Sequence, residues 1–448
     1  MKRDIVIKLC EWKNDPLRKP LIIRGARQVG KTWVANAFGK EHYKNFVSIN
    51  LELQPQFRSC FENLDPAEII NRIELTANVQ LTSPDTLLFL DEIQTCPKAI
   101  SALRYFYELK PELSIIAAGS LLEFIEKNED LSFPVGRVTN FFLSPLSFGE
   151  FLTAFKEERL REHLATLTLS SVIAPSVEIK ASDLLKKYLY VGGMPATVAQ
   201  FVTNGKLSLT DQYHSSLLQN YRHDFGKYGK INSEILEKTY MKIPGMVGTS
   251  FRYNSIDNAE SGKNIKRAVD LLEKARIHSR IFSTSAAGLP FYTYKNERKF
   301  KTLFLDVGLL QNAMGISSQT YLAPDLLSVY RGAVTEQYVG QQLLALKKPY
   351  EEPDLFFWQR DAVGSESEVD YLFQYQDKII PIEVKSGKTG TLKSMKLFLE
   401  EKKAPFGIRF SQLPLSFHEK ILSIPLYAIE STPNLVEELI GNPLRESN

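Results

Sequence analysis

The feature that most constrains this chain is a glycine-bearing loop between a short apolar segment and a helical pattern. Leu21 begins LIIRGARQVGKTWVANAF, in which residues 25–32 fit the spacing GxxxxGK[ST]. Glycines let successive backbone N–H groups curl around phosphate oxygens, and the helix that follows offers its positive end to the same anion. The spacing therefore predicts a strand, a phosphate-binding loop and a helix, in that order.

Every residue of this loop is a candidate for contact with a nucleotide. Lys31 is predicted to neutralise the β- and γ-phosphates, and the Thr32 hydroxyl is predicted to be a magnesium ligand. The predicted phosphate-binding residues are Gly25, Ala26, Arg27, Gln28, Val29, Gly30, Lys31 and Thr32.

Two adjacent acids end a later apolar strand pattern. Asp91 and Glu92 follow the apolar run in TLLFLDEIQ. A carboxylate at the end of such a strand can hold magnesium through water, and its neighbour can orient the attacking water. We predict the first role for Asp91 and the second, catalytic, role for Glu92. The alternative is that the two acids cap the next helix.

Two further polar residues are candidates for contact with the transferred phosphate. Ser120 ends the strand pattern SIIAAGS, where its side chain can sense the γ-phosphate; as a lone serine it can equally cap a helix. Arg137, in PVGRV, is predicted to be an arginine finger, in its own chain or in a neighbouring copy. The alternative for Arg137 is a surface ion pair.

Composition bounds the number of domains and the kinds of partner. The chain has 448 residues, which at roughly one to two hundred residues per domain predicts two to four folding units. The excess of basic over acidic residues is 55 − 52 = 3, so nucleic-acid affinity would have to come from a local basic surface. The longest apolar run, residues 113–122, is about half a membrane span, so we expect a cytoplasmic protein without membrane contact.

Hydrophobic patterns divide the chain into segments. Apolar strand patterns separated by helical ones characterise the first 150 residues and predict an α/β domain with a parallel sheet covered on both faces. Residues 151–240 are helical in pattern, apart from the turn VGGMP. Residues 241–315 contain an amphipathic helix followed by two strand patterns, as in a winged helix. The last segment opens with a helix and continues with strands.

Charged and apolar residues alternate on two strand patterns of the last segment. Along EVDYLF and IPIEVK, the side chains of Asp370, Glu383 and Lys385 can point to the same side. Two carboxylates at a magnesium-binding distance, with an ammonium nearby to lower the pKa of a water, suit phosphodiester hydrolysis. A solvated strand face gives the same letters, so a surface without chemistry is the alternative.

A basic helix pattern is the candidate nucleic-acid surface. Residues 262–280 contain six basic residues and two acids. Lys263, Lys266 and Arg267 fall opposite the apolar face and are predicted to contact DNA phosphates. The following strands form a predicted wing that adds Lys295, Arg298, Lys299 and Lys301. An ordinary solvated helix face is the alternative.

The order of these motifs resembles that of AAA-type ATPases of the P-loop class. More closely, it resembles a prokaryotic family in which such an ATPase is fused to a C-terminal domain of unknown function. The resemblance implies ATP as the nucleotide and Mg²⁺ as its metal, and it leaves open a homo-oligomer. It runs from about residue 18 to residue 390 and is carried by RGARQVGKT, LFLDEIQ, AAGS, PVGRV with FLSPLSFGEF, YVGGMP and LFLDVGLL.

The last segment is similar to the PD-(D/E)XK nuclease superfamily. This similarity implies that Asp370 and Glu383 are metal ligands and that Lys385 is catalytic. Glu336, on the preceding helix, matches an acid that this superfamily often adds, and is a further predicted metal ligand. Val369 stands where a proline would precede the aspartate, which loosens the motif without removing a ligand.

Together these features predict an α/β protein with four parts. They are a P-loop parallel-sheet ATPase core of the AAA type at 1–150, a helical lid at 151–240, a winged helix at 241–315 and a nuclease-like α/β domain at 325–448. The expected function is Mg²⁺-dependent ATP hydrolysis linked to a DNA-directed module with nuclease activity. In one alternative the nuclease-like domain is inactive and the chain is a nucleotide-switched DNA-binding or protein-interaction module. In another it is an ATPase adaptor for a second protein, without nucleic acid.

Overall fold

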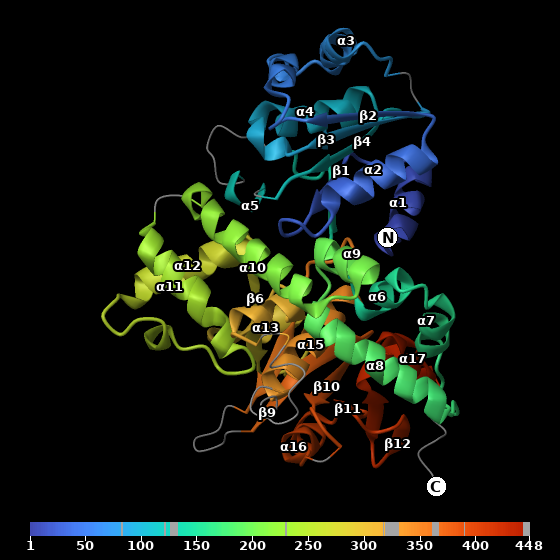
Figure 1. Cartoon of the computed structure of the whole chain (residues 1–448), viewed down its shortest axis with the longest axis vertical. Helices are drawn as coiled ribbons and strands as arrows, with labels where there is room; N and C mark the ends of the chain where they lie inside the picture. The colour runs from blue at the N-terminus through green and yellow to red at the C-terminus, as the bar shows by residue number, and fades with distance from the viewer. Residues whose placement is uncertain are drawn as a thin grey trace.

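A computed structural model shows two β-sheets joined by a largely helical middle segment (Figure 1). The described residues are 1–81, 84–120, 122–125, 133–228, 231–316, 318, 331–360, 367–388 and 390–441. The domain boundary predicted at residue 325 lies outside them.

The first sheet consists of five parallel strands in the order β2-β3-β4-β1-β5. The strands are β1 Leu21–Arg24, β2 Asn45–Asn50, β3 Thr86–Asp91, β4 Ser114–Ala118 and β5 Thr139–Phe142. Leu21 and Ile23 pack in one hydrophobic core and Ile22 in another, because alternate side chains point to opposite faces of a sheet. The predicted parallel α/β sheet is therefore confirmed.

Helices cover both faces of this first sheet. They are α1 Ile5–Asn14, α2 Lys31–His42, α3 Pro66–Ala77, α4 Pro97–Leu109 and the short α5 Leu122–Ile125. α1 and α2 pack in the core that holds Leu21, whereas α3 and α4 pack in the core that holds Ile22. Because all five strands run in the same direction, the segments that follow β1, β3 and β4 meet at one edge of the sheet.

The middle segment is helical. Its helices are α6 Phe148–Ala154, α7 Glu158–Ala165, α8 Pro175–Val191, α9 Pro195–Asn204, α10 Leu207–His223, α11 Ser233–Lys242 and α12 Gly262–Lys274. The short 3-10 helix η3, Asp224–Lys227, follows α10 directly. The VGGMP turn ends α8 and begins α9, and α10 to α12 lie below the first sheet, close to β6 (His278–Thr284) of the second sheet (Figure 1).

The second sheet has eight strands in the order β12-β13-β11-β10-β9-β8-β6-β7. They are β6 His278–Thr284, β7 Lys295–Phe304, β8 Phe356–Gln359, β9 Glu368–Tyr375, β10 Lys378–Val384, β11 Gly407–Ser411, β12 Ser416–His418 and β13 Ile421–Pro425. β6 and β7 form an antiparallel hairpin, and β6 also pairs in parallel with β8. The hairpin interpreted from the sequence as a wing is therefore part of the C-terminal sheet. The reason is its apolar half: Ile281, Leu303 and Phe304 are buried, and an apolar strand edge is stabilised by a neighbouring strand.

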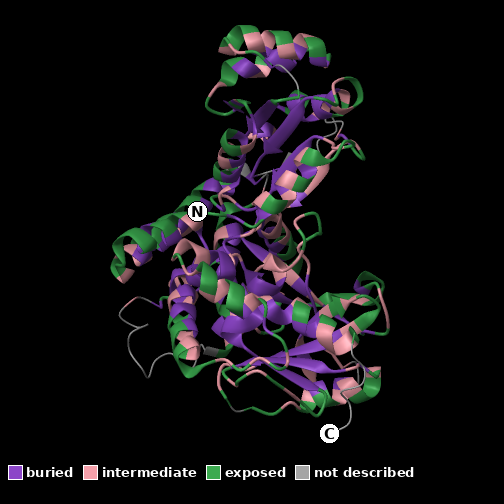
Figure 2. Cartoon of the chain, turned by 90° about the vertical axis from the view of Figure 1, so that its right-hand side faces the viewer, coloured by how far each residue is buried: buried purple, intermediate pink, exposed green. Residues whose placement is uncertain are grey.

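Within the described part of the chain, four further helices pack with this sheet. They are α13 Val307–Ala313, α15 Arg331–Ala345, α16 Lys393–Lys402 and α17 Thr432–Gly441. The strands of both sheets are largely buried, while the helices expose their outer faces (Figure 2). No helix among the described residues is long and apolar enough to span a bilayer.

A buried carboxylate connects two of the sequence motifs. Asp306, in LFLDVGLL, accepts hydrogen bonds from the first N–H groups of α13, and its Oδ2 accepts one from the Gly193 N–H at 2.6 Å. A Cβ atom at Gly192, where φ is 72°, would lie 2.0 Å from Asp306 Oδ1. Gly192 is therefore required by this close approach, and a Cβ atom at Gly193 would lie 2.2 Å from the carbonyl oxygen of Leu146, so both glycines serve a structural turn.

Candidate functional site

The loop after β1 has the shape of a phosphate cradle. Gly25, Gln28 and Gly30 have φ angles of 147°, 62° and 97°, so the chain curls before α2 begins at Lys31. A Cβ atom at Gly25 would lie 2.3 Å from the carbonyl oxygen of Leu143, so glycine is required there. This curl turns the loop toward the amino end of α2, which favours an anion.

Lys31 is a buried cation with neutral partners. Its side-chain ammonium donates hydrogen bonds to the carbonyl oxygens of Gly25 at 2.9 Å and Ala26 at 2.7 Å. Burial lowers the pKa of Lys31 from 10.5 to about 8, and the more distant charges of Glu92 and Glu123 offset this shift in part. An anion bound in the cradle would stabilise the charged form, as expected for a phosphate-binding lysine.

The predicted magnesium residues lie side by side. Thr32 Oγ1 donates a hydrogen bond to Asp91 Oδ2 at 3.0 Å, and Asn50 Nδ2 donates to the same oxygen at 3.1 Å. Burial, and then the charge of Glu92, raise the pKa of Asp91, so a cation beside it would be favourable. A hydroxyl and a carboxylate this close are hard oxygen donors, and they fit Mg²⁺.

Glu92 follows β3 in a left-handed conformation, with φ 49°. Its carboxylate accepts a hydrogen bond from the side-chain amide of Gln94. Glu92 makes no side-chain capping bond, and α4 begins after Cys96. The alternative that Glu92 caps the following helix is therefore not what the structure shows.

Ser120 joins the phosphate loop. Its side chain is 4% exposed, and its Oγ accepts a hydrogen bond from Arg27 Nε at 3.2 Å. Arg27 also forms an ion pair with Asp224 of η3. The structure therefore brings Ser120 to the loop that carries Lys31, as predicted for a residue that senses the γ-phosphate.

Arg137 lies at the opposite edge of the sheet. It precedes β5, whose first residue, Thr139, pairs with Leu21 at the start of β1. The phosphate loop begins only after β1 has ended, at the other end of that strand. Instead, Arg137 Nε contacts Glu108 Oε1 at 2.9 Å, and its side chain is 43% exposed. The ion pair of the alternative is therefore present, and the arginine-finger role of Arg137 stays a prediction.

The second sheet brings together the charged residues predicted for its site. Asp370 on β9 accepts a hydrogen bond through Oδ2 from the Val384 N–H of β10 at 2.8 Å. Glu383 accepts a hydrogen bond through Oε1 from Lys385 Nζ at 2.6 Å. Burial, and then the charge of Asp370, raise the pKa of Glu383 to about 7.

A lysine from the neighbouring strand β7 lies among the carboxylates. Lys301 is 1% exposed, and its ammonium lies 2.9 Å from Glu336, 2.5 Å from Glu368 and 3.7 Å from Asp370. Burial alone would lower the pKa of Lys301, but these three carboxylates outweigh it and raise the pKa above its ordinary value. Burial also raises the pKa of Glu336, to about 7. Lys301, which was predicted to lie on an exposed DNA-binding wing, is thus a buried partner of acids.

This arrangement does not fit a metal ion as it stands. The described residues contain no group of three or more His, Cys, Asp and Glu side chains placed to hold one. Glu336 and Asp370, both predicted as metal ligands, have the Lys301 ammonium as their counter-charge instead. The sequence pattern placed these residues near one another but did not indicate the cation that neutralises them.

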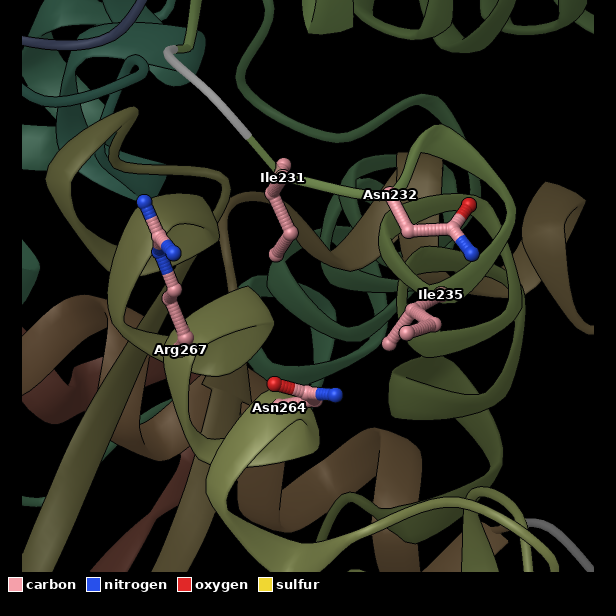
Figure 3. A pocket seen from close by; sticks show the side chains of 5 residues that line it. All are labelled: Ile231, Asn232, Ile235, Asn264 and Arg267. Atoms are coloured by element: carbon pink, nitrogen blue, oxygen red, sulfur yellow. The ribbon is translucent and has the colours of Figure 1, made fainter.

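The basic residues predicted to contact DNA lie on the outer face of α12. Lys263, Lys266 and Arg267 are exposed, while Ile265 and Val269 on the opposite face are buried. Figure 3 shows Arg267 beside a cavity of about 370 Å³ between α11 and α12, lined also by Ile231, Asn232, Ile235 and Asn264.

Two other cations of this segment have acidic partners. Arg276 contacts Glu123 at 2.8 Å, and Arg280 forms ion pairs with Asp270 and Glu273. Fewer of the six basic residues in 262–280 therefore lack an acidic partner than the sequence suggested.

Family comparisons agree with the geometry of the first sheet. Residues 17–152 match the model of an AAA domain. Two domains of unknown function match later segments of the chain, DUF8612 at residues 182–320 and DUF4143 at residues 331–428. No curated protein matches the chain by sequence.

Solved structures similar to this chain include a Walker-type ATPase, a branch migration motor and a protein solved with DNA. A Walker-type ATPase of Pyrococcus abyssi is 15% identical, with 70% of this chain and 95% of that chain covered and a TM-score of 0.43. The Thermotoga maritima RuvB Holliday junction branch migration motor is 14% identical, with coverages of 62% and 90% and a TM-score of 0.30. The Aeropyrum pernix ORC1 protein, solved in complex with DNA, is 14% identical, with coverages of 69% and 91% and a TM-score of 0.24. At these scores the likeness adds nothing to the assignment of the AAA domain.

Sequence reasoning missed two residues around the AAA domain's phosphate loop. Asn50 ends β2 in register with Asp91, so its position at the end of a neighbouring strand was a usable signal. Asp224 reaches Arg27 from a 3-10 helix far along the chain, and no local pattern indicates it.

Proposed function

We propose that this chain binds ATP with Mg²⁺ and hydrolyses it. The observation that carries the proposal is the geometry around Thr32, whose hydroxyl lies 3.0 Å from Asp91 directly after the buried Lys31. Lys31 has neutral carbonyl partners at present, and phosphate oxygens are stronger acceptors for an ammonium than carbonyls are.

Each residue of this site has a proposed role in ATP binding or hydrolysis. The loop N–H groups and Lys31 bind and orient the phosphates, while Thr32 and Asp91 would hold the metal. Mg²⁺, when bound, supplies positive charge to the β- and γ-phosphate oxygens. Glu92 orients a water toward the γ-phosphate and accepts its proton, while Gln94 fixes the direction of the Glu92 carboxylate.

Replacement of Glu92 tests this assignment. The variant Glu92→Gln keeps the size of the side chain and removes its basicity, so it should bind ATP normally and hydrolyse it about a hundredfold more slowly. The exposed Glu41, on α2, is a matched control, and Glu41→Gln should hydrolyse ATP at the wild-type rate. Normal turnover in Glu92→Gln would contradict the role of Glu92 as base.

Arg137 is proposed to act in a second copy of the chain. Arg137 pairs with Glu108, and the apolar residues near these two in the sequence, Val135 and Leu109, are exposed. Exposed apolar side chains there would be buried by contact with a second copy. Arg137→Ala and Lys31→Ala should each hydrolyse ATP slowly, and mixing the two should restore part of the activity. Mixtures no more active than their components would count against a shared site.

Binding of DNA is the second proposed property, and the exposed basic face of α12 favours it. Each lysine or arginine that contacts a phosphate contributes about one unit to the slope of log affinity against log salt. The triple variant Lys263→Ala, Lys266→Ala, Arg267→Ala should therefore lower that slope by about three units.

A variant with the same charge change on α16, Lys393→Ala, Lys396→Ala, Lys402→Ala, is the control and should keep the slope. Absent or salt-insensitive binding by the wild-type chain would favour the adaptor alternative.

Nuclease activity remains a prediction, supported by the grouping of Asp370, Glu383 and Lys385 and opposed by the buried Lys301. If the site is active, purified protein with Mg²⁺ or Mn²⁺ should nick plasmid DNA, and Asp370→Asn should not. The control Asp377→Asn changes an exposed acid between β9 and β10. An intact plasmid with every protein and metal would favour the alternative of an inactive nuclease-like domain.

A further inference from the structure

Arg27 connects the phosphate loop to the helical middle segment. Its guanidinium forms an ion pair with Asp224, and its Nε donates to Ser120 Oγ at 3.2 Å. The hydroxyl of Tyr221, at the end of α10, donates to the Arg27 carbonyl oxygen at 2.8 Å. The end of α10 and the start of η3 are thus held by a residue of the nucleotide site.

Arg27 is a second positive charge in the phosphate cradle. It lies two residues after Gly25, and its charge contributes to the low pKa of Lys31. Its side chain is 27% exposed, so a ligand can approach it. Its neighbour Ser120 ends the strand segment next to β1 and β3, where the γ-phosphate is expected.

Asp224 is the counter-charge of Arg27. Asp224 is 5% exposed. Its charge acts on Tyr228, whose pKa is raised first by burial and then by the Asp224 carboxylate. A buried carboxylate that loses its cation is strongly destabilised, so it must find water or another partner. Removal of Arg27 from Asp224 would therefore displace η3.

We propose that the γ-phosphate of ATP competes with Asp224 for the Arg27 guanidinium, so that η3 and the end of α10 respond to triphosphate and not to diphosphate. This inference rests on the proposed nucleotide binding and adds a residue pair that discriminates between the two nucleotides. A phosphate with two or more accessible oxygens can accept both guanidinium N–H groups, which makes it a strong competitor for a carboxylate.

The fold offers a route for the displacement to travel. His214, in the middle of α10, donates from Nε2 to the Val191 carbonyl oxygen at 2.9 Å, beside the VGGMP turn. That turn is bound through Gly193 to Asp306, which caps α13 ahead of the second sheet. A shift of α10 therefore acts on the junction between the middle segment and the C-terminal sheet.

Nucleotide affinities of Asp224→Asn test the competition. Removing the Asp224 charge leaves Arg27 available, so affinity for ATPγS should rise about tenfold while affinity for ADP stays unchanged. Arg27→Ala should lower ATPγS affinity toward that of ADP, and adding Asp224→Asn to it should have no further effect. Asp211→Asn is the control, because Asp211 lies on the same helix and accepts a hydrogen bond from Tyr190, away from the loop.

Titration calorimetry with ATPγS and ADP separates the possible results. If neither nucleotide binds the wild-type chain, both the proposed function and this inference fail. If both bind but Asp224→Asn leaves their affinity ratio unchanged, the inference alone is overturned.

Hydrogen exchange of the wild-type protein gives a second test that needs no variant. Amide exchange at residues 224–228 should be faster with ATPγS than with ADP. Equal exchange in the two complexes would contradict the displacement of η3.

Discussion

Lys31 in the AAA domain and Lys301 in the second sheet are both buried lysines, yet their surroundings give them opposite properties. Lys31 donates to two backbone carbonyls, and burial lowers its pKa to about 8. Lys301 lies within 3.7 Å of three carboxylates, which raise its pKa despite burial. The first ammonium lacks a close anion among its described contacts, and the second has several.

This difference indicates which site can take an anionic ligand. A buried cation with neutral partners gains free energy when a phosphate approaches, because the phosphate supplies the missing counter-charge. A buried cation among carboxylates has its counter-charge already, and it ties the strands and helix that carry them together. Lys31 therefore suits ligand binding, and Lys301 suits structure.

The largest predicted effect comes from removing the Lys301 charge. In Lys301→Met, Glu336, Glu368 and Asp370 keep their places without a cation, so the free energy of unfolding should fall by about 3–5 kcal/mol. Urea denaturation at pH 7 measures this change. The exposed Lys299 lies on the same strand, and Lys299→Met should change stability by less than about 0.5 kcal/mol. If Lys301→Met were as stable as Lys299→Met, Lys301 would not be a structural cation, and its contrast with Lys31 would fail.

The sequence was sufficient to predict the strand, loop and helix around Lys31 because these elements are local in the chain. The loop, its flanking strand and its helix are consecutive, although the carbonyl oxygen of Leu143 that requires glycine at Gly25 comes from a distant segment. Asp91 could be added because parallel strands end at one edge of a sheet. The same rule, applied to the start of β5, would have shown that Arg137 lies at the other edge.

The sequence was insufficient for the second site because its charge balance comes from distant segments. Asp370 and Glu383 were grouped correctly by strand alternation, since β9 and β10 are neighbours. Lys301 enters from β7 and Glu336 from α15, and no periodicity within either segment indicates that they meet. The pairing of β6 with β8, which brings the hairpin into the sheet, is likewise a long-range contact.

The same substitution at Lys31 should have a smaller effect on free energy, and a different one. Lys31→Met should weaken ATP binding about a hundredfold, which corresponds to about 2.7 kcal/mol, through loss of a charge-assisted contact. Its unfolding midpoint in urea should stay at or above the wild-type value, because the variant no longer buries a cation whose partners are neutral. Calorimetry with ATP and urea denaturation measure the two quantities. A stability loss as large as that of Lys301→Met would mean that Lys31 also acts as a structural cation.

The smallest predicted effect is a pH dependence, which should differ between Lys31 and Lys301. ATP binds the protonated form of Lys31, whose pKa in the free protein is about 8, so affinity should fall about tenfold per pH unit above pH 8. Over the same range the unfolded chain, in which the pKa of this lysine is near 10.5, binds more protons than the folded one, so the contribution of Lys31 to stability rises with pH. The contribution of Lys301 to stability has the opposite pH dependence. Because the folded-state pKa of Lys301 is raised, its stabilising contribution is complete below the pKa of an ordinary lysine and is lost as the pH rises above that value.

The variant Lys31→Arg tests the pH dependence of ATP affinity, because arginine stays charged over the whole range. Its affinity for ATP, measured by calorimetry from pH 7 to pH 9.5, should be weaker than wild type at pH 7 and nearly constant. A parallel decline in Lys31→Arg would assign the pH dependence to another group.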